Sequence, residues 1–356
     1  MRDLIDILDL TTQEIDVLLE TAADIIAHPA AYSERCRGKQ LAALFFEPST
    51  RTRLSFESAM LALGGQVLSV AGAASSSVTK GESIADTART VSCYADIIAM
   101  RHPLEGAALV ASQSVPIPVI NAGDGGHCHP TQTLADLLTI HRKKGSFSHL
   151  TVGLCGDLKY GRTVHSLIAA LSRYEDVKFV LISPAELRLP DYVIDGMKEK
   201  GIPYVETASL EEAMPGLDIL YMTRIQRERF DDPALYEALK DSYILTPEKM
   251  ALGKQDMCVL HPLPRVNEIS VQVDQDPRAC YFEQMFNGKM MRMALILHML
   301  KAPTDKRVEK PLVHHLRCRN PKCISQVEQE LQPAFFPAGA PGRPLYRCLY
   351  CESQAE

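Results

Sequence analysis

Short apolar runs of strand length recur along this chain, separated by longer amphipathic stretches. Such runs, mostly continuous rather than alternating, with helix-length segments between many of them, are typical of parallel sheets covered by helices. At 356 residues, the chain has room for two units of this kind and a small appendage. We therefore predict an α/β protein with two doubly wound parallel-sheet domains. The expected strands lie at residues 40–46, 95–100, 150–156, 177–183, 218–223 and 257–261.

Two longer segments with helical patterns join these units. Residues 131–144 carry apolar side chains at helical spacing and end before Gly145, which predicts a helix connecting the two lobes. Residues 288–300 are apolar on most sides and predict a buried helix whose methionines fill the core. A charged, proline-bearing segment follows and indicates a linker. The domains we expect are 1–135 with the returning helix 288–302, then 136–287, a linker at 303–313 and a small zinc-ribbon-like domain at 314–356.

Four of the ten cysteines crowd the tail, whereas the other six are scattered singly. Cys318 and Cys323 form one pair, Cys348 and Cys351 form another, and 24 residues separate the pairs. Four thiolates at this spacing suit a tetrahedral structural zinc. A secreted disulfide framework is the alternative. The single cysteines upstream and an acidic, amphipathic start argue instead for a reducing, cytoplasmic compartment.

The charge balance narrows the classes of partner. A formal net charge of -6 disfavours a general nucleic-acid binder, which needs clustered lysine and arginine to neutralise phosphates. No apolar run approaches the roughly 20 residues of a membrane helix. We therefore expect neither nucleic acid nor membrane as a partner, although small anions can still bind locally.

The segment 45–65, FFEPSTRTRLSFESAMLALGG, combines the end of a strand with the start of a helix. After a turn, Ser49 or Thr50 can cap a helix that ends at residues 64–65. The helix start gathers free backbone N–H groups, hydroxyls and the Arg51 guanidinium, which together suit a phosphate. Plain capping with solvated arginines is the alternative. The density of STRTR directly after a strand favours the anion site.

This segment resembles the carbamoyl-phosphate signature that aspartate and ornithine carbamoyltransferases share, FxxSTRTRxSFE. The resemblance covers about residues 1–302 and is specific because many motifs occur together. It implies an enzyme, a transferase, that carbamoylates an amino acid. The further matches are GESIADT (81–87), MRHP (100–103), NAGDG (121–125), HPTQTLADL (129–137), GDLKYGRTVHS (156–166), YMTRIQRER (221–229) and HPLPRVNEI (261–269).

The chemistry of such a reaction decides which groups are needed. An amine attacks the carbonyl carbon of carbamoyl phosphate, negative charge grows on the carbonyl oxygen, and phosphate leaves. The protein must supply fixed donors and cations rather than a nucleophile. The resemblance implies Ser49, Thr50, Arg51 and Thr52 at the phosphate, Thr52, Arg101 and His129 at the carbonyl oxygen, and Gln132 with the backbone of Pro262, Leu263 and Pro264 at the carbamoyl amide. It also implies a cis Leu263–Pro264 peptide.

Of the two side chains implied at the carbonyl oxygen, Arg101 has support from its position in the sequence, whereas His129 has support only from the resemblance. Arg101 follows the apolar run 95–100, which places it at a strand's carboxyl end, where open α/β sheets bind ligands. His129 precedes the connector helix, and only the family match raises it above a structural histidine. His127, Cys128 and His129 could together suggest a metal site, but H-C-H lacks a recognisable ligand spacing.

Residues 71–81, AGAASSSVTKG, are low in bulky side chains and predict a surface loop. In the family, the equivalent loop reaches into the active site of a neighbouring subunit, which implies a homotrimer with shared sites. Ser76 and Lys80 match its functional serine and lysine, whereas Thr79 replaces a lysine that some relatives carry. A loop that only links two elements, with a solvated Lys80, is the alternative.

The acceptor is predicted from charge and from one turn. Arg162 and Arg224 follow strands and can each bind a carboxylate with two donors, and Gln226 adds an uncharged contact. HPLP stands where ornithine enzymes typically show HCLP, which favours aspartate. The implied reaction converts carbamoyl phosphate and L-aspartate to N-carbamoyl-L-aspartate and phosphate, early in de novo pyrimidine biosynthesis. Glu47 is expected to tie the lobes together through Arg162 and Arg229.

The tail resembles the zinc domain of the aspartate carbamoyltransferase regulatory chain, through CxNxxCIS (318–325) and CxYCE (348–352). In that family the domain docks on catalytic chains, so it could extend the assembly. No room remains between residues 300 and 318 for the regulatory chain's nucleotide-binding domain, which predicts that this chain lacks an ATP or CTP site. The zinc is expected to be structural, with no cofactor needed for the chemistry. The alternatives are another amino-acid acceptor, or a catalytically silent scaffold or zinc-ribbon binding protein.

Overall fold

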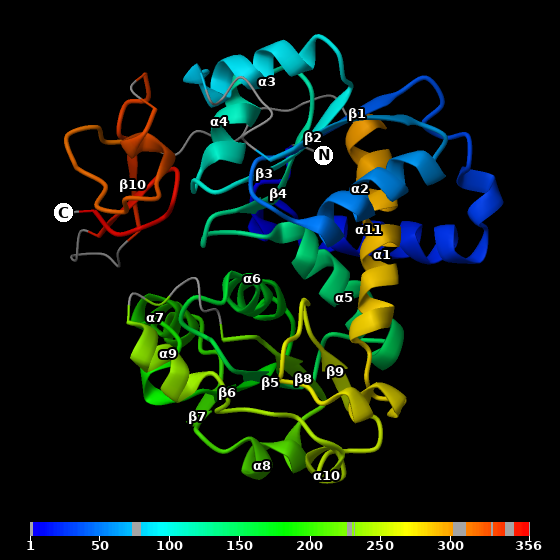
Figure 1. Ribbon diagram of the computed structural model, residues 1–356, viewed down its shortest axis with the longest axis vertical. Helices are drawn as coiled ribbons and strands as arrows, with labels where there is room; N and C mark the ends of the chain where they lie inside the picture. Colours follow the sequence, from blue (N-terminus) through cyan, green and yellow to red (C-terminus); the bar gives the residue numbers. More distant parts are fainter. Residues whose placement is uncertain are drawn as a thin grey trace. The chain divides into compact units, whose positions relative to one another are not determined.

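The computed structural model describes residues 3–72, 80–225, 230, 232–301, 311–328, 330–338 and 345–355 (Figure 1). The chain divides into two compact units. The first contains Met1–Thr131 and Lys289–Glu356, and the second contains Gln132–Gly288. Each holds a parallel sheet with helices, which confirms the predicted fold class. The structure divides the chain after Thr131 and Gly288, whereas the sequence predicted boundaries after residues 135 and 287.

The sheet of the first unit has the strand order β2-β1-β3-β4, and all its pairs are parallel. The chain passes from β1 to β2 on one side and then returns to β3 on the other side of β1. The order therefore reverses between β1 and β3, and ligands bind at such switch points in open α/β sheets. The strands are β1 (Gln40–Phe45), β2 (Gln66–Ala71), β3 (Ile97–His102) and β4 (Val119–Asp124).

Helices and short 3-10 turns surround this sheet. The first helix begins with a capping box in which Thr11 and Glu14 bond each other's backbone N–H groups at 3.1 and 2.8 Å. Its buried residues recur at helical spacing, which packs one face into the core. The elements are η1 (Ile7–Asp9), α1 (Thr12–Ala27), η2 (Pro29–Tyr32), α2 (Thr50–Ala62), α3 (Ile84–Ser92) and α4 (Ala107–Ser114).

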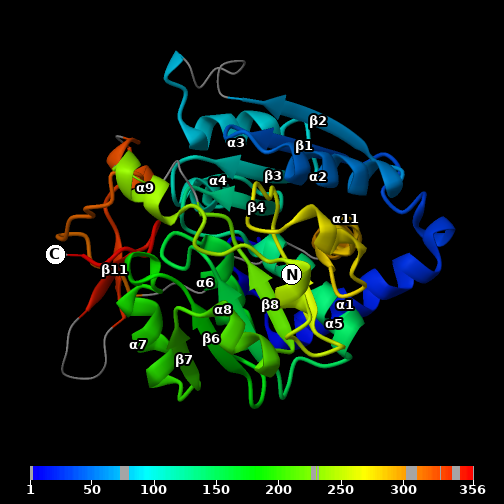
Figure 2. The ribbon, with the colours of Figure 1, turned by 60° about the horizontal axis from the view of Figure 1, so that its bottom comes forward.

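The second unit contains a five-stranded parallel sheet in the order β7-β6-β5-β8-β9, whose strands are all labelled in Figure 1, and Figure 2 shows β6, β7 and β8 from another side. Its switch point lies between β5 and β8, because β6 and β7 extend the sheet on one side and β8 and β9 on the other. The strands are β5 (Thr151–Cys155), β6 (Lys178–Ile182), β7 (Tyr204–Thr207), β8 (Ile219–Met222) and β9 (Cys258–Leu260).

The connections of the second unit are short helices, and two long helices flank it along the chain. The helix expected at 288–300 begins seven residues earlier, as α11 (Tyr281–Lys301). The apolar pattern did not reveal this start, because it contains the polar residues Gln284 and Asn287, which are nevertheless fully buried. The elements are α5 (Pro130–Lys144), α6 (Arg162–Leu171), η5 (Ala185–Leu187), α7 (Asp191–Glu199), α8 (Leu210–Ala213), η6 (Met214–Gly216), α9 (Pro233–Leu239), α10 (Pro247–Met250) and η8 (Val271–Gln275).

The C-terminal segment, here called the tail module (residues 311–356), belongs to the first unit. It contains η9 (Ile324–Gln326) and an antiparallel pair formed by β10 (Phe335–Pro337) and β11 (Tyr346–Cys348). Its buried side chains, among them Phe335 and Tyr350, share one hydrophobic cluster with residues of α3 and α4. Among the described residues, no helix is long and apolar enough to span a membrane.

Candidate functional site

The switch point of the first unit brings the end of β1 next to the end of β3. Phe45 is paired with Arg101, and the N–H of Phe46 donates to the carbonyl of Arg101 at 2.9 Å. The predicted helix then begins at Thr50, with Ser49 in the N-cap position. Its hydroxyl makes no capping hydrogen bond, so the capping role considered for Ser49 is not what the structure shows.

The first turn of α2 has the composition of an anion site. Thr50 and Arg51 are exposed, Thr52 is buried, and the N–H groups of the turn carry the positive end of the helix dipole. Arg53 is engaged differently, because its guanidinium lies 3.6 Å from the carboxylate of Glu57. The cationic and hydroxyl groups of the first turn therefore lie at the switch point, where a phosphate is expected.

Arg101 is held in place by a carboxylate of the same unit. Its Nη2 lies 2.9 Å from Oε2 of Glu47, and only 12% of its side chain is exposed. Glu47 was expected to join Arg162 and Arg229 between the lobes. Arg162 belongs to the second unit and Arg229 lies outside the described residues, so that role stays a prediction.

The turn between β4 and α5, residues 124–129, is organised by a fully buried carboxylate. Asp124 accepts hydrogen bonds from the backbone N–H of Gly106 at 2.8 Å and of Cys128 at 3.0 Å, and from the Asn121 amide at 2.9 Å. Nδ1 of His127 lies 3.1 Å from Asp124 Oδ2. Burial opposes ionisation, but His127 and these donors outweigh it and hold the pKa of Asp124 below its usual value.

His129 is buried and ends this turn, directly before α5 begins at Pro130. Asp124, His127 and Cys128 have potential metal-ligand atoms within 4.8 Å of one another. This cluster contains two of the three residues considered as a metal site from the sequence, with Asp124 in place of His129. Each oxygen of Asp124, however, already has two hydrogen-bond partners, and these explain the cluster as a fold feature of the turn.

One residue that sequence reasoning missed joins both parts of this region. Arg292, in α11, is buried and lies over the ring of Phe56 at 5.1 Å. Its Nη1 donates to Ser55 in α2 at 3.1 Å, and its Nη2 donates to Thr131 at the start of α5 at 3.4 Å. Arg292 thus positions α2 relative to the segment that follows His129. A charged residue inside an apolar helix was the available signal.

The loop predicted to carry Ser76 and Lys80 is only partly described. Strand β2 ends at Ala71, Lys80 is exposed, and Ser83 caps α3 by accepting the N–H of Asp86 at 3.2 Å. Ser76 and Thr79 lie outside the described residues, so their roles stay predictions.

The switch point of the second unit carries the two predicted acceptor arginines. The ends of β5 and β8 approach closely: Gly156 has a φ of +113°, and a Cβ there would lie 2.4 Å from the Thr223 carbonyl oxygen. Arg162 is the first residue of α6 after β5, and Arg224 follows β8. Both arginines therefore lie in the segments that follow the carboxyl ends of two neighbouring strands, β5 and β8. Gln226 lies outside the described residues.

The turn after β9 is fixed by a buried His–Glu pair. Nε2 of His261 lies 2.7 Å from Glu268, and its Nδ1 accepts the N–H of Leu263 at 2.8 Å, which together define its tautomer. Burial opposes ionisation of Glu268, but His261 and the backbone donors outweigh it and lower its pKa. The Leu263–Pro264 peptide is cis, as expected.

Gln132 is buried, and its side-chain amide donates to Asp136 at 2.8 Å, a carboxylate that also accepts from Gln284. Asp136, which lies in the same helix, thus holds the side chain of Gln132 in place. Its predicted contact with the carbamoyl amide stays a prediction.

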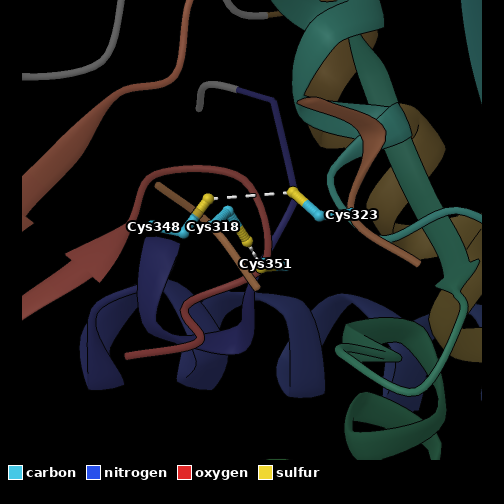
Figure 3. A group of neighbouring side chains, drawn as sticks. All are labelled: Cys318, Cys323, Cys348 and Cys351. Carbon is cyan, nitrogen blue, oxygen red and sulfur yellow. Dashed lines mark hydrogen bonds between the residues drawn. The ribbon is translucent and has the colours of Figure 1, made fainter. Parts of the chain in front are cut away.

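The four tail cysteines come together as one cluster (Figure 3). The sulfurs of Cys318 and Cys351 are 3.5 Å apart, and those of Cys323 and Cys348 are 3.7 Å apart. Sulfurs about 2.3 Å from a tetrahedral ion would be separated by roughly 3.8 Å. All four side chains are buried, so this donor set fits a closed metal site.

Comparison with known proteins identifies the catalytic part of the chain. Residues 2–142 match the carbamoyl-P binding domain of aspartate/ornithine carbamoyltransferases, and residues 148–299 match the Asp/Orn binding domain. The aspartate carbamoyltransferase catalytic subunits of Clostridium novyi and Lachnoclostridium phytofermentans are 60% and 61% identical, over 84% of this chain and 98% of each relative. The chain belongs to the aspartate/ornithine carbamoyltransferase family.

Solved structures of this family agree. The catalytic subunit of M. jannaschii aspartate transcarbamoylase is 48% identical, with a TM-score of 0.79 over 85% of this chain and 98% of that one. The Trypanosoma cruzi enzyme, in complex with carbamoyl phosphate and aspartate, is 39% identical, with a TM-score of 0.78 over 83% and 96%. These relatives confirm the predicted function: the chain is a transferase, an aspartate carbamoyltransferase.

The tail module has its own match. Residues 311–356 correspond to the metal binding domain of the aspartate carbamoyltransferase regulatory chain. This confirms the resemblance seen in the sequence, and with the sulfur cluster it supports a structural metal.

Proposed function

We propose that the first unit binds carbamoyl phosphate at the switch point between β1 and β3. Ser49, Thr50, Arg51 and Thr52 hold the phosphate group. The supporting observation is that an uncapped helix start, two exposed residues of the STRT segment and the end of β3 meet at one sheet edge. Backbone N–H groups, hydroxyls and a guanidinium neutralise a phosphate without proton transfer.

In this proposal, Thr52, Arg101 and His129 stabilise the negative charge that develops on the carbonyl oxygen. The amine of aspartate forms a bond to the carbonyl carbon, the bond from that carbon to the phosphate oxygen breaks, and the amine loses a proton. Gln132 and the backbone of residues 262–264 orient the carbamoyl amide. The rate gain comes from positioned donors, and removing one such donor typically lowers a rate by about 10²–10³-fold.

We also propose that Arg162 and Arg224 bind the carboxylates of L-aspartate, with Gln226 and Lys80 as further contacts. Guanidinium groups hold carboxylates with two parallel hydrogen bonds. The support is their position after adjacent strands β5 and β8, at the switch point of the second unit. N-carbamoyl-L-aspartate, the product, is then a precursor in pyrimidine biosynthesis.

An acceptor-resolved assay tests this assignment. Arg224→Ala should raise the KM for L-aspartate at least about 100-fold, because one charge-assisted contact contributes roughly 1.5–3 kcal/mol and a bidentate pair more. The KM for carbamoyl phosphate should change far less. Arg188→Ala is the control, since Arg188 is an exposed arginine that pairs with Asp191 in the same unit. Activity of the wild-type chain with ornithine but not aspartate would reject the assignment.

The metal of the tail module is proposed to be zinc, because four thiolates at tetrahedral spacing are its characteristic donor set. A location in the cytoplasm is proposed from the free thiols of the cysteines. We further propose a homotrimer in which Ser76 and Lys80 of one chain complete the site of the next, and the tail module could join such trimers.

A complementation experiment tests the shared site. An Arg51→Ala chain and a Lys80→Ala chain are each expected to be almost inactive alone. Mixed after reversible dissociation, they should recover activity, because some hybrid sites contain an intact Arg51 and an intact Lys80. Absence of recovery, in mixtures shown by native mass spectrometry to contain hybrid trimers, would place the whole site within one chain.

A further inference from the structure

The tail module is joined to the catalytic part of the first unit by backbone hydrogen bonds. Glu105 forms an isolated parallel bridge with Cys323, one of the metal-site cysteines. The N–H of Glu105 donates to the carbonyl of Lys322 at 2.8 Å, and the N–H of Ile324 donates to the carbonyl of Glu105 at 2.9 Å. The segment that carries Cys323 is therefore held directly against the loop between β3 and α4.

The side chain of Glu105 extends this connection to the 124–129 turn. Its Oε2 accepts a hydrogen bond from the Asn320 amide at 2.5 Å, and its Oε1 accepts from the backbone N–H of Gly126 at 3.1 Å. Gly125 has a φ of +51°, and a Cβ there would lie 2.7 Å from Cγ of Glu105. One carboxylate thus contacts the tail module with one oxygen and the turn with the other.

A second contact reaches the same turn from the other cysteine pair. Nε2 of His127 lies 4.0 Å from Oε2 of Glu352, the residue after Cys351. Close packing accompanies it, because a Cβ at Gly106 would lie 2.6 Å from Cβ of Tyr350. The N–H of Gly106 donates to Asp124, the carboxylate that organises the turn. Both cysteine pairs therefore adjoin residues that fix the conformation of this turn.

We propose that Glu105 is a positioning residue through which the metal-bound tail module holds the 124–129 turn, and with it His129, in the geometry that binds carbamoyl phosphate. The inference rests on the proposed role of His129. Metal binding orders the segment around Asn320 and Cys323. Glu105 then fixes Gly126, three residues before His129. The module is in this way a support for the active site in the same chain.

The inference predicts a kinetic effect without metal loss. Glu105→Ala should keep one metal ion per chain, yet lower kcat/KM for carbamoyl phosphate about tenfold or more. Amide hydrogen exchange at residues 125–129 should speed up by a similar factor. Glu105→Gln should recover only part of both properties, because its single amide oxygen can accept from Gly126 or from Asn320 but not from both, and the Asn320 side-chain oxygen already accepts the N–H of Lys322 at 2.9 Å.

Two further variants test whether the effect of Glu105→Ala comes from its contacts with the 124–129 turn or from a general destabilisation of the tail module. Tyr350→Phe removes a hydroxyl whose hydrogen bond, to the Gln332 carbonyl at 3.2 Å, lies within the tail module, so its kinetics should match the wild type. Asn320→Ala should reproduce part of the Glu105→Ala effect, and the double variant should be less impaired than the two effects combined. Additive effects, or unchanged exchange in Glu105→Ala, would overturn the inference. If the wild-type chain did not carbamoylate aspartate, that result would instead overturn the proposed function.

Discussion

Replacing Arg51 with alanine is expected to lower kcat/KM for carbamoyl phosphate about 10²–10³-fold, while the fold remains unchanged. The side chain is exposed in the first turn of α2, so its removal leaves no cavity in the core. In the proposed site, the substitution removes a charge-assisted contact with the phosphate at the positive end of the helix. Steady-state kinetics with both substrates varied, together with circular dichroism, would measure the two parts of this expectation.

Arg53→Ala is the matched control for this variant. Arg53 lies in the same helix and carries the same charge, but its guanidinium faces Glu57 at 3.6 Å and Ser69 at 3.4 Å. A general loss of positive charge from α2 would affect both variants equally. We expect less than a tenfold change for Arg53→Ala, and an equal loss in the two variants would show that Arg51 has no specific role at the phosphate.

Loss of the tail metal is expected to have the largest effect on stability. Cys348→Ser should abolish metal binding and unfold the tail module, since metal binding supplies roughly 10–16 kcal/mol to small four-ligand zinc sites. Unfolding would also expose the apolar residues of α3 and α4 that share a cluster with Phe335 and Tyr350. A loss of even 2–3 kcal/mol corresponds to a fall of about 5 °C or more in the unfolding temperature of a unit of this size.

Metal content per chain and differential scanning calorimetry would measure this effect, and treatment of the wild type with a chelator should reproduce it. Cys93→Ser is the control, because Cys93 is an exposed thiol of the same unit outside the cluster. Its metal content and unfolding temperature should match the wild type. An unchanged unfolding temperature in metal-free Cys348→Ser would mean that the module contributes nothing to the stability of the first unit.

Sequence patterns predicted some elements well and missed others for physical reasons. The continuous apolar runs at β1, β3, β5, β6, β8 and β9 were found because buried parallel strands are apolar on both faces. Strand β4 was missed because it contains Asn121 and Asp124, which are fully buried only because they bond each other and the backbone. Strand β2 was missed because, at the edge of its sheet, it is largely exposed.

The chemistry of the candidate site was readable because it is local. A strand end, a run of hydroxyls and arginines, and a helix start follow one another within ten residues, so neighbours in the chain are neighbours in the site. The same holds for each cysteine pair of the tail module. The family and the type of reaction therefore followed from the sequence.

Which distant groups face each other could be decided only by the tertiary structure. Arg292 joins Ser55 and Thr131, across 237 and 161 residues of chain. Glu47 pairs with Arg101, and Glu105 connects Asn320 to Gly126. A charged side chain shows in the sequence that it needs a partner when buried, but not which one, because the choice depends on how packed helices and strands bring remote segments together.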